Sequence, residues 1–225
     1  MSTPERLEGI RVVGFDLDQT LYPKSPEIDE MIGHYLYERI VEHRSVSLAE
    51  ARELFTSRYL EGSGMSGGEV MRDLGLANGA ELVQEALERA DITSLLQPDP
   101  ATCELLAALA QSYRSVDLIT GSGREQARQK LAALNIPLET FGLVITDDEA
   151  SKATGASYRL WLSHYPNLGP DQFVYIGDRP RSDYEIPAAL GIRTVLVYVR
   201  ETNPDIDAYQ IANLLGLRDI LLMKD

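Results

Sequence analysis

The stretch VVGFDLD, Val12 to Asp18, places two aspartates directly after a short apolar run. A short apolar run bounded by polar residues is typical of a buried strand in a parallel sheet. Sheets of this kind bind their ligands at the carboxyl ends of the strands. We therefore predict that Asp16 and Asp18 lie at the end of the first strand and that Asp16 faces an active-site crevice.

Further apolar runs that are rich in β-branched residues predict the rest of the sheet. Helical patterns such as Arg124–Leu134 and Ser157–His164 separate the later runs, and this alternation predicts a mainly parallel sheet. Right-handed crossovers then give a doubly wound, Rossmann-like α/β fold with five strands. The predicted strands are Val12–Phe15, Val116–Ile119, Leu143–Ile145, Phe173–Ile176 and Thr194–Val199.

A helical insertion separates the first two predicted strands. It is far longer than one crossover helix requires, and residues 28–90 repeat apolar positions at helical spacing. A glycine-rich patch at residues 61–69 breaks these helices, and we expect it to form a turn. We predict two domains: residues 1–22 with 98–225 form the α/β core, and residues 23–97 form an inserted α-helical cap.

Composition limits the class of protein and its partners. The 225 residues include 35 acidic side chains against 21 lysines and arginines, a net charge of −14, which disfavours nucleic acids and anionic membranes as partners. The first residues lack the apolar segment of a signal peptide and no run has the length of a membrane span, so we expect a cytoplasmic location. The single cysteine, Cys103, excludes an internal disulfide and a cysteine-rich zinc site. The sequence leaves the oligomeric state open.

Three of the predicted strands end in polar side chains that suit one reaction. Asp16, Thr120 and Asp178 each follow an apolar strand, and Asp183 comes shortly after Asp178 in the same loop. If these strands are neighbours at the switch point of the sheet, their ends converge on one pocket. Because carboxylates repel an anion, a phosphate substrate in such a pocket needs a metal ion or a lysine beside it.

With these residues in place, the chain resembles the haloacid dehalogenase superfamily over nearly its whole length. All four motifs of the superfamily are present in order, and they are carried by Asp16, Asp18 and Thr20, then by Thr120, then by Lys152, and then by Asp178 and Asp183. The resemblance implies an α/β core of that superfamily's type and a hydrolase that acts through an aspartate.

Charge and reach agree with the resemblance on the roles of the catalytic residues. A carboxylate can attack phosphorus, so Asp16 is the expected nucleophile and forms an aspartyl-phosphate. Asp18 is expected to protonate the leaving group and later to take a proton from water. Thr120 and the backbone amide of Gly121 are expected to donate hydrogen bonds to the phosphoryl oxygens, where Lys152 adds positive charge.

Magnesium is the expected cofactor. Asp16, Asp178 and, as the resemblance implies, the backbone carbonyl of Asp18 form the all-oxygen set that Mg²⁺ prefers. Asp183 is expected to hold a metal-bound water or to support the metal's ligands. Thr20 is expected to fix the turn after the first strand through its hydroxyl.

Asp18 separates the possible reactions of the superfamily. Its dehalogenases lack a second aspartate and need no metal, so the resemblance favours a Mg²⁺-dependent phosphatase of a small phosphorylated metabolite over a 2-haloacid dehalogenase. A phosphomutase stays open because it would use the same residues. A protein that binds a phosphorylated ligand or another protein without turnover is the alternative outside the enzymes.

The insertion is similar to that of the pyrimidine 5′-nucleotidase-like branch of the superfamily. The similarity rests on the segments LYPKSPEID at residues 21–29 and YLEGSGMSGGEV at residues 59–70. Members of that branch dephosphorylate nucleoside monophosphates, which makes a nucleoside 5′-monophosphate one candidate substrate. We expect the cap to set specificity by closing over the leaving group, with Tyr22 among the candidate substrate-side residues.

Overall fold

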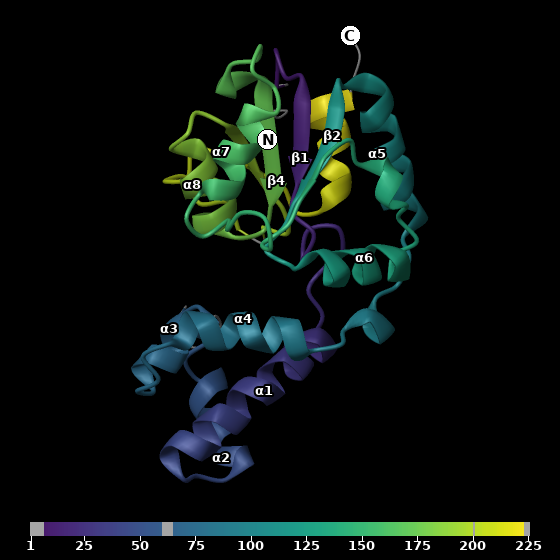
Figure 1. Cartoon of the computed structure of the whole chain (residues 1–225). Helices are drawn as coiled ribbons and strands as arrows, with labels where there is room; N and C mark the ends of the chain where they lie inside the picture. Colours follow the sequence, from purple (N-terminus) through teal and green to yellow (C-terminus); the bar gives the residue numbers. More distant parts are fainter. Residues whose placement is uncertain (1–6, 60–64, 200, 223–225) are drawn as a thin grey trace. The chain divides into compact units, whose positions relative to one another are not determined.

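The protein divides into two compact units in a computed structural model that describes residues 7–59, 65–199 and 201–222 (Figure 1). The described parts of Met1–Pro23 and Leu96–Asp225 belong to the first unit, and those of Lys24–Leu95 belong to the second. Every residue that the sequence motifs single out lies in the first unit.

A parallel sheet forms the centre of the first unit. Its strand order is β3-β2-β1-β4-β5-β6, so β1 lies between β2 and β4, where the winding of the chain reverses direction. This order confirms the doubly wound α/β class. The strands are β1 (Val12–Phe15), β2 (Ser115–Ile119), β3 (Val144–Ile145), β4 (Phe173–Gly177), β5 (Arg193–Leu196) and β6 (Tyr209–Gln210).

The prediction of five strands is wrong, because the sheet has a sixth strand at its edge. β6 has only two residues, both half-buried, and pairs with Val195 and Leu196 of β5. Such a short strand has no apolar run that could mark it in the sequence. The fifth predicted strand also ends earlier than expected, since Tyr198 has a positive φ of 59°, which an extended strand does not allow.

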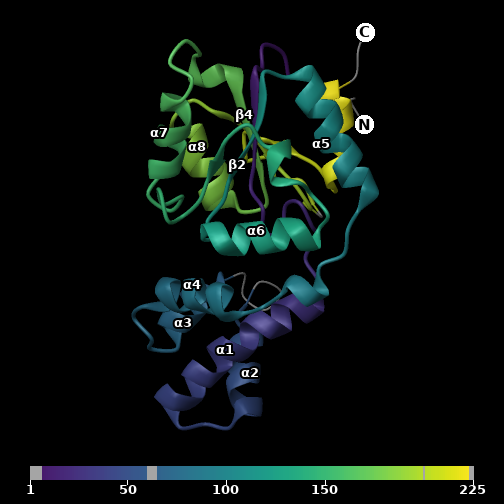
Figure 2. The same ribbon diagram turned by 45° about the vertical axis from the view of Figure 1, so that its right-hand side comes forward.

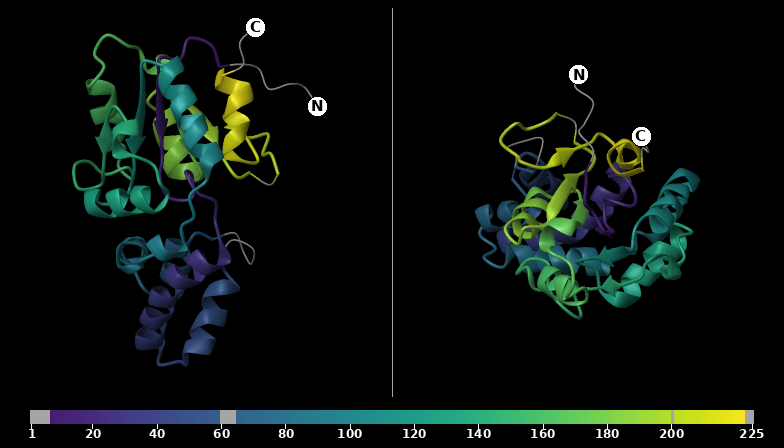
Figure 3. Two further views of the ribbon diagram at one scale, coloured as in Figure 1. Left: turned by 90° about the vertical axis from the view of Figure 1, so that its right-hand side faces the viewer. Right: turned by 90° about the horizontal axis from the view of Figure 1, so that it is seen from above.

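Helices cover both faces of this sheet. Helices α7 and α8 lie on one face, and α5 lies on the other beside the C-terminal helical turns (Figure 1 and Figure 3). Helix α6 lies at the edge of the unit where β1 and β2 end (Figure 2). The helical segments of this unit are α5 (Pro100–Ser112), α6 (Arg124–Ala133), α7 (Ala156–Ser163), α8 (Ile186–Ala188) and the short turns Leu138–Thr140, Pro170–Gln172, Pro180–Glu185, Leu214–Gly216 and Arg218–Leu222.

The second unit is helical in its described part, as the sequence predicts for the insertion. Two of its helices begin with a capping box, in which a serine at the helix start and a glutamate one turn later exchange hydrogen bonds: Ser47 with Glu50, and Ser66 with Glu69. Its helices are α1 (Pro26–Arg44), α2 (Leu48–Thr56), α3 (Gly67–Asp73), α4 (Gly79–Arg89) and the turn Thr93–Leu95.

The second unit has a hydrophobic core of its own. Leu36 and Ile40 of α1 pack with Phe55 of α2 and with Met71 and Leu74 at the end of α3. Of the glycine-rich patch in the sequence, residues 61–64 lie outside the described residues, and the rest leads into α3. No helix within the described ranges is long and apolar enough to cross a membrane.

Gly14 in β1 leaves room for the aromatic side chains that pack on one face of the sheet. A Cβ atom there would lie 2.6 Å from the ring of Trp161, which is fully buried against Phe173 and donates its indole N–H to Asp117 at 2.7 Å. We expect Gly14→Ala to lower the free energy of unfolding by about 1–3 kcal/mol, because a packed core accommodates an added methyl group poorly. Urea denaturation measures this effect. Gly121→Ala is the matched control, since a Cβ there meets no atom within 4 Å, and equal losses in both variants would contradict the argument.

Candidate active site

Three aspartates converge where β1 and β4 end. Asp16 follows β1, Asp178 follows β4, and Asp183 lies in the helical turn that comes next. One carboxylate oxygen from each lies within 4.8 Å of those from the other two. The parallel pairing of β1 and β4 brings Asp16 and Asp178 together, and the backbone N–H of Asp16 donates to the carbonyl of Ile176 at 2.8 Å. The structure thus brings together, at the carboxyl ends of β1 and β4, three of the residues that the sequence singles out.

Asp183 is held by the backbone of its own loop. Its Oδ2 accepts the N–H groups of Asp178 at 3.1 Å and Arg179 at 3.0 Å, and the residue is fully buried. Gly177 makes this possible, because a Cβ at that position would lie 2.4 Å from the Asp183 side chain. Burial opposes ionisation, but the attraction of Lys152 and the hydrogen bonds outweigh it and lower the pKa of Asp183.

Lys152 bridges two of the aspartates. Its Nζ lies 2.8 Å from Oδ1 of Asp16 and 2.8 Å from Oδ1 of Asp183, and it lies 5.3 Å from the centre of the Tyr175 ring. The pKa values of the two aspartates beside Lys152 nevertheless shift in opposite directions. Asp183 also has backbone donors, and its pKa is lowered, whereas burial raises the pKa of Asp16 to about 7 despite the attraction of Lys152.

The acidic cluster has the chemistry of a site for a hard divalent cation. All three side chains offer carboxylate oxygens. Asp16 and Asp183 are buried, and the side chain of Asp178 is likewise only 2% exposed. Lys152 and Arg179, whose Nε lies 3.9 Å from Oδ1 of Asp178, are the cations beside these three carboxylates, and ionisation of all three would still leave excess negative charge in a desolvated place. Mg²⁺ prefers oxygen ligands and bears the charge that would balance this excess, so the residues present fit this ion.

Asp18 has different surroundings from Asp16. Its Oδ1 accepts hydrogen bonds from the Tyr22 hydroxyl at 2.6 Å and from Lys130 Nζ at 2.7 Å, and its Oδ2 accepts one from the Ser122 hydroxyl at 2.6 Å. Burial opposes ionisation here too, but the attraction of Lys130 and these hydrogen bonds lower the pKa of Asp18. The two aspartates of the first motif therefore differ in their partners and in the direction of their pKa shifts.

Two of the residues around Asp18 are not identified by the sequence reasoning, namely Ser122 and Lys130. The sequence does carry a signal for the lysine. Lys130 lies on the stripe of α6 that also holds Ala127, Leu131 and Leu134, and a lysine on the buried stripe of a helix is uncommon. Tyr22, one of the candidate substrate-side residues, is buried and donates its hydroxyl hydrogen to Asp18.

Thr120 and Gly121 lie at the end of β2. The Oγ1 of Thr120 accepts the N–H of Ser122 at 3.0 Å, which leaves its own hydroxyl hydrogen able to donate. Gly121 borders open space, because a Cβ atom there would meet nothing within 4 Å. These features suit the recognition of an anion's oxygens at the strand end.

Thr20 does not act as expected through its side chain. The turn after β1 is closed by the backbone, where the N–H of Leu21 donates to the carbonyl of Leu17 at 3.0 Å. The hydroxyl of Thr20 is buried and has no hydrogen-bond partner within the described part of the chain. The backbone therefore holds the turn that carries Asp18.

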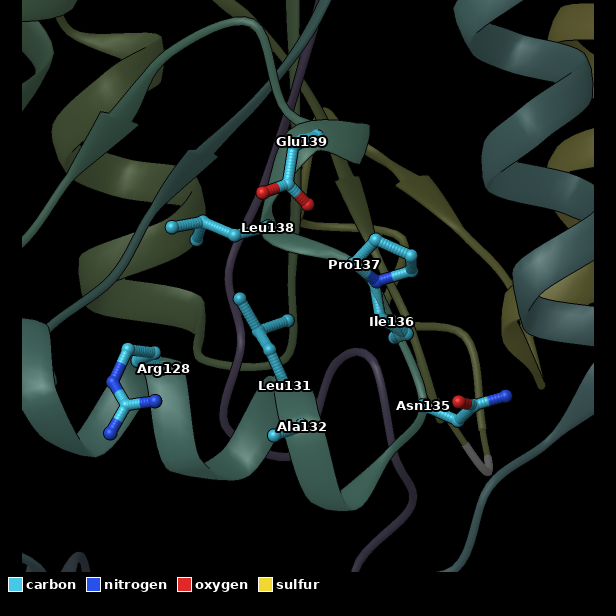
Figure 4. A pocket seen from close by; sticks show the side chains of 8 residues that line it. All are labelled: Arg128, Leu131, Ala132, Asn135, Ile136, Pro137, Leu138 and Glu139. Atoms are coloured by element: carbon cyan, nitrogen blue, oxygen red, sulfur yellow. The ribbon is translucent and has the colours of Figure 1, made fainter.

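A separate apolar groove lies between α6 and the segment that follows it (Figure 4). Figure 4 shows Leu131 and Ala132 of α6 opposite Pro137 and Leu138 of the following turn. None of the residues that line this groove belongs to the acidic cluster or contacts Asp18. The groove is therefore not part of the candidate active site.

Comparisons with known proteins point to one family. The family model of haloacid dehalogenase-like hydrolases matches residues 10–191. A HAD phosphatase from Thermococcus onnurineus is 25% identical over 93% of this chain and 96% of its own, with a TM-score of 0.60. The YfnB protein from Bacillus subtilis bound to magnesium is 17% identical over 97% of this chain and 100% of its own, with a TM-score of 0.58. A haloacid dehalogenase-like family hydrolase from Xanthomonas campestris is 23% identical over 92% of each chain, with a TM-score of 0.57. A search of curated protein sequences gave no match.

Proposed function

The chain belongs to the haloacid dehalogenase-like hydrolases, and from this premise we propose that it is a Mg²⁺-dependent phosphatase of a small phosphorylated metabolite. One observation carries the proposal: Asp16 lies in the acidic cluster with Lys152, while Asp18 lies two residues away in the separate setting of Lys130 and Ser122. Two carboxylates in different surroundings can take different roles in one reaction. The phosphatase from Thermococcus onnurineus, with the same fold, supports this choice of reaction.

In the proposed reaction, Asp16 is the nucleophile. A carboxylate oxygen of Asp16 attacks phosphorus, and the bond between phosphorus and the leaving oxygen breaks as the aspartyl-phosphate forms. Water then attacks the same phosphorus, the bond to Asp16 breaks, and inorganic phosphate leaves. The position of Asp16 at the end of β1, bonded through its backbone N–H to β4, gives the attacking group a rigid support.

Asp18 moves the protons of both steps. In the first step the protonated carboxyl of Asp18 gives its proton to the leaving alkoxide, and in the second the carboxylate takes a proton from the attacking water, so the acid form is restored at the end of the cycle. Because Lys130 and the hydrogen bonds lower the pKa of Asp18 in the free protein, the acid form has to arise as the negative charge of the bound phosphate raises that pKa. Both oxygens of the Asp18 carboxyl group accept hydrogen bonds: Oδ1 from Lys130 and Tyr22, and Oδ2 from Ser122. Such fixed placement is what a proton donor needs.

Thr120 and Lys152 bind the transferring phosphoryl group. The Thr120 hydroxyl keeps its hydrogen available, and the open space beside Gly121 gives the phosphoryl oxygens access to this strand end. Lys152 contributes a buried positive charge beside Asp16. Preorganised donors and charge in a desolvated site stabilise the transition state of such a transfer.

Asp16 and Asp178 would hold the Mg²⁺ ion, with the backbone carbonyl of Asp18 as the ligand that the family resemblance implies, and Asp183 would hold a metal-bound water or support these ligands. When bound, the ion supplies positive charge against the carboxylates and orients the phosphoryl group. The magnesium bound to YfnB from Bacillus subtilis supports this choice of cation.

Removing divalent cations should lower the activity by about 10³-fold or more, because one unit negative charge ~4 Å from the phosphate already opposes it by about 4 kcal/mol at an effective dielectric of 20. The measurement is hydrolysis of p-nitrophenyl phosphate before and after treatment with EDTA, followed by addition of Mg²⁺ in excess. Circular dichroism of the EDTA-treated protein checks that the fold persists. Full activity in EDTA would contradict the role of the metal.

A broader assay tests the proposed function itself. The native protein is assayed with Mg²⁺ against phosphorylated metabolites, with nucleoside 5′-monophosphates as one group of the panel and 2-haloacids as a separate group. Release of phosphate from at least one monoester is the expected result. No phosphate release from any compound would refute the proposal, and metal-independent halide release would favour a dehalogenase instead.

A further inference from the structure

We propose that Lys130 is a positioning residue that holds the carboxyl group of Asp18 in the orientation needed for proton transfer. The inference rests on the proposed function, because it requires that Asp18 exchange protons with the reacting oxygen. It concerns a helix residue that belongs to none of the four sequence motifs.

Lys130, Ser122 and Asp18 form a closed ring of contacts. Lys130 Nζ lies 2.7 Å from Oδ1 of Asp18 and 2.9 Å from Oγ of Ser122, and the Ser122 hydroxyl donates to Oδ2 of Asp18 at 2.6 Å. Because the ring engages both carboxylate oxygens, it fixes the plane of the carboxyl group as well as its position. Tyr22 adds a further hydrogen bond to Oδ1. The ring thus connects the turn after β1, which carries Asp18, to Ser122 just before α6 and to Lys130 within α6.

The exposed fractions of the two side chains place Lys130 behind Asp18. The side chain of Lys130 is 4% exposed, whereas that of Asp18 is 14% exposed. A substrate therefore reaches Asp18 more readily than the ammonium group behind it. Asp18 is the group that can touch the reacting oxygen, and Lys130 is the group that supports it.

Stability alone does not explain a lysine at this place. Ala127, Leu131 and Leu134 surround it on the buried stripe of α6, where an apolar side chain would pack without desolvating a charge. Replacing a buried ion pair by apolar groups is often neutral or stabilising. Orientation does explain it, since a displacement of about 1 Å in a reacting group can cost on the order of 10²-fold in rate.

The dependence of rate on the leaving group tests this role. An alkoxide must be protonated as it leaves, whereas p-nitrophenolate is a stable anion and needs little help from an acid. We expect Lys130→Met to lower kcat/KM by about 10²-fold for the alkyl phosphate that the native enzyme hydrolyses best, and by less than about 3-fold for p-nitrophenyl phosphate. A general loss of structure would lower both values alike.

A double-mutant cycle shows whether Lys130 acts through Asp18. Asp18→Asn alone should give the same selective loss on the alkyl phosphate, and adding Lys130→Met to it should cost little more, because the partner is already gone. Arg128→Met is the matched control, because Arg128 is an exposed cation on the same helix that pairs with Glu125. It should leave both rates unchanged.

Ser122→Ala keeps the inference testable if Lys130→Met does not fold. It removes one side of the ring without leaving a buried charge unpaired, and we expect a selective loss of about 10-fold on the alkyl phosphate. Equal losses on both substrates in the folded variants would overturn the role of Lys130 and leave the phosphatase intact. A native protein without phosphatase activity would instead refute the proposed function.

Discussion

Replacing Asp16 with asparagine should lower the hydrolysis of p-nitrophenyl phosphate by more than about 10⁴-fold, the order of loss that follows removal of a covalent nucleophile. Asparagine has nearly the size and shape of aspartate, but its neutral amide is a poor nucleophile and cannot form the acyl phosphate that the carboxylate forms. Initial rates in saturating Mg²⁺ measure the loss. Acid quenching with labelled substrate gives a second measurement, since phosphate should stay bound to the native protein and be missing from the variant.

The Asp16→Asn variant should fold, so the loss of activity can be assigned to chemistry. Asp16 lies beside Asp178 and Asp183, and its own pKa is raised by burial. A neutral side chain relieves repulsion in this cluster, and Lys152 keeps its ion pair with Asp183 at 2.8 Å, so no buried charge is left unpaired. We therefore expect a melting temperature no lower than that of the native protein without metal. Asp171→Asn, an exposed aspartate before β4, is the control and should keep full activity. Retained activity in Asp16→Asn would exclude a reaction through this aspartate.

The sheet could be predicted from the sequence where its strands are long enough to form an apolar run. β1, β2 and β4 are buried almost throughout, and a run of apolar residues is the pattern that such burial requires. β6 could not be predicted, because two half-buried residues at an edge need no such run. The end of β5 depends on the backbone turn at Tyr198, which neighbouring structure imposes and apolar spacing does not indicate.

The candidate site divides in the same way. Asp16, Asp178 and Asp183 could be brought together from sequence, since the carboxyl ends of neighbouring parallel strands meet at one edge. The role of Lys130 could not be predicted from sequence. Helical spacing indicates that Lys130 lies on the buried stripe of α6, but it does not indicate which strand end that stripe faces. Its contact with Asp18 depends on where α6 lies over the sheet, a property of the tertiary structure.

Replacing Lys152 with methionine should lower activity by about 10²–10³-fold, the range seen when one preorganised group that stabilises a transition state is removed. Methionine keeps much of the volume of the lysine stem but removes the charge between Asp16 and Asp183. Breaking a buried ion pair from one side costs about 3–5 kcal/mol, so the metal-free variant should also be less stable than the native protein. Arg159→Met, an exposed cation on α7, is the control for loss of a positive charge.

The response of Lys152→Met to Mg²⁺ separates an electrostatic role from a packing role. Lys152 and a divalent cation would both neutralise the carboxylates of Asp16 and Asp183, so each reduces the gain from the other. Without the lysine, the ion meets a more negative site, binds more tightly and stabilises the folded state by a larger amount. Mg²⁺ should therefore raise Tm more in the variant than in the native protein. If the variant lost stability only through packing, Mg²⁺ would raise Tm equally in both, and that result would contradict a shared electrostatic role.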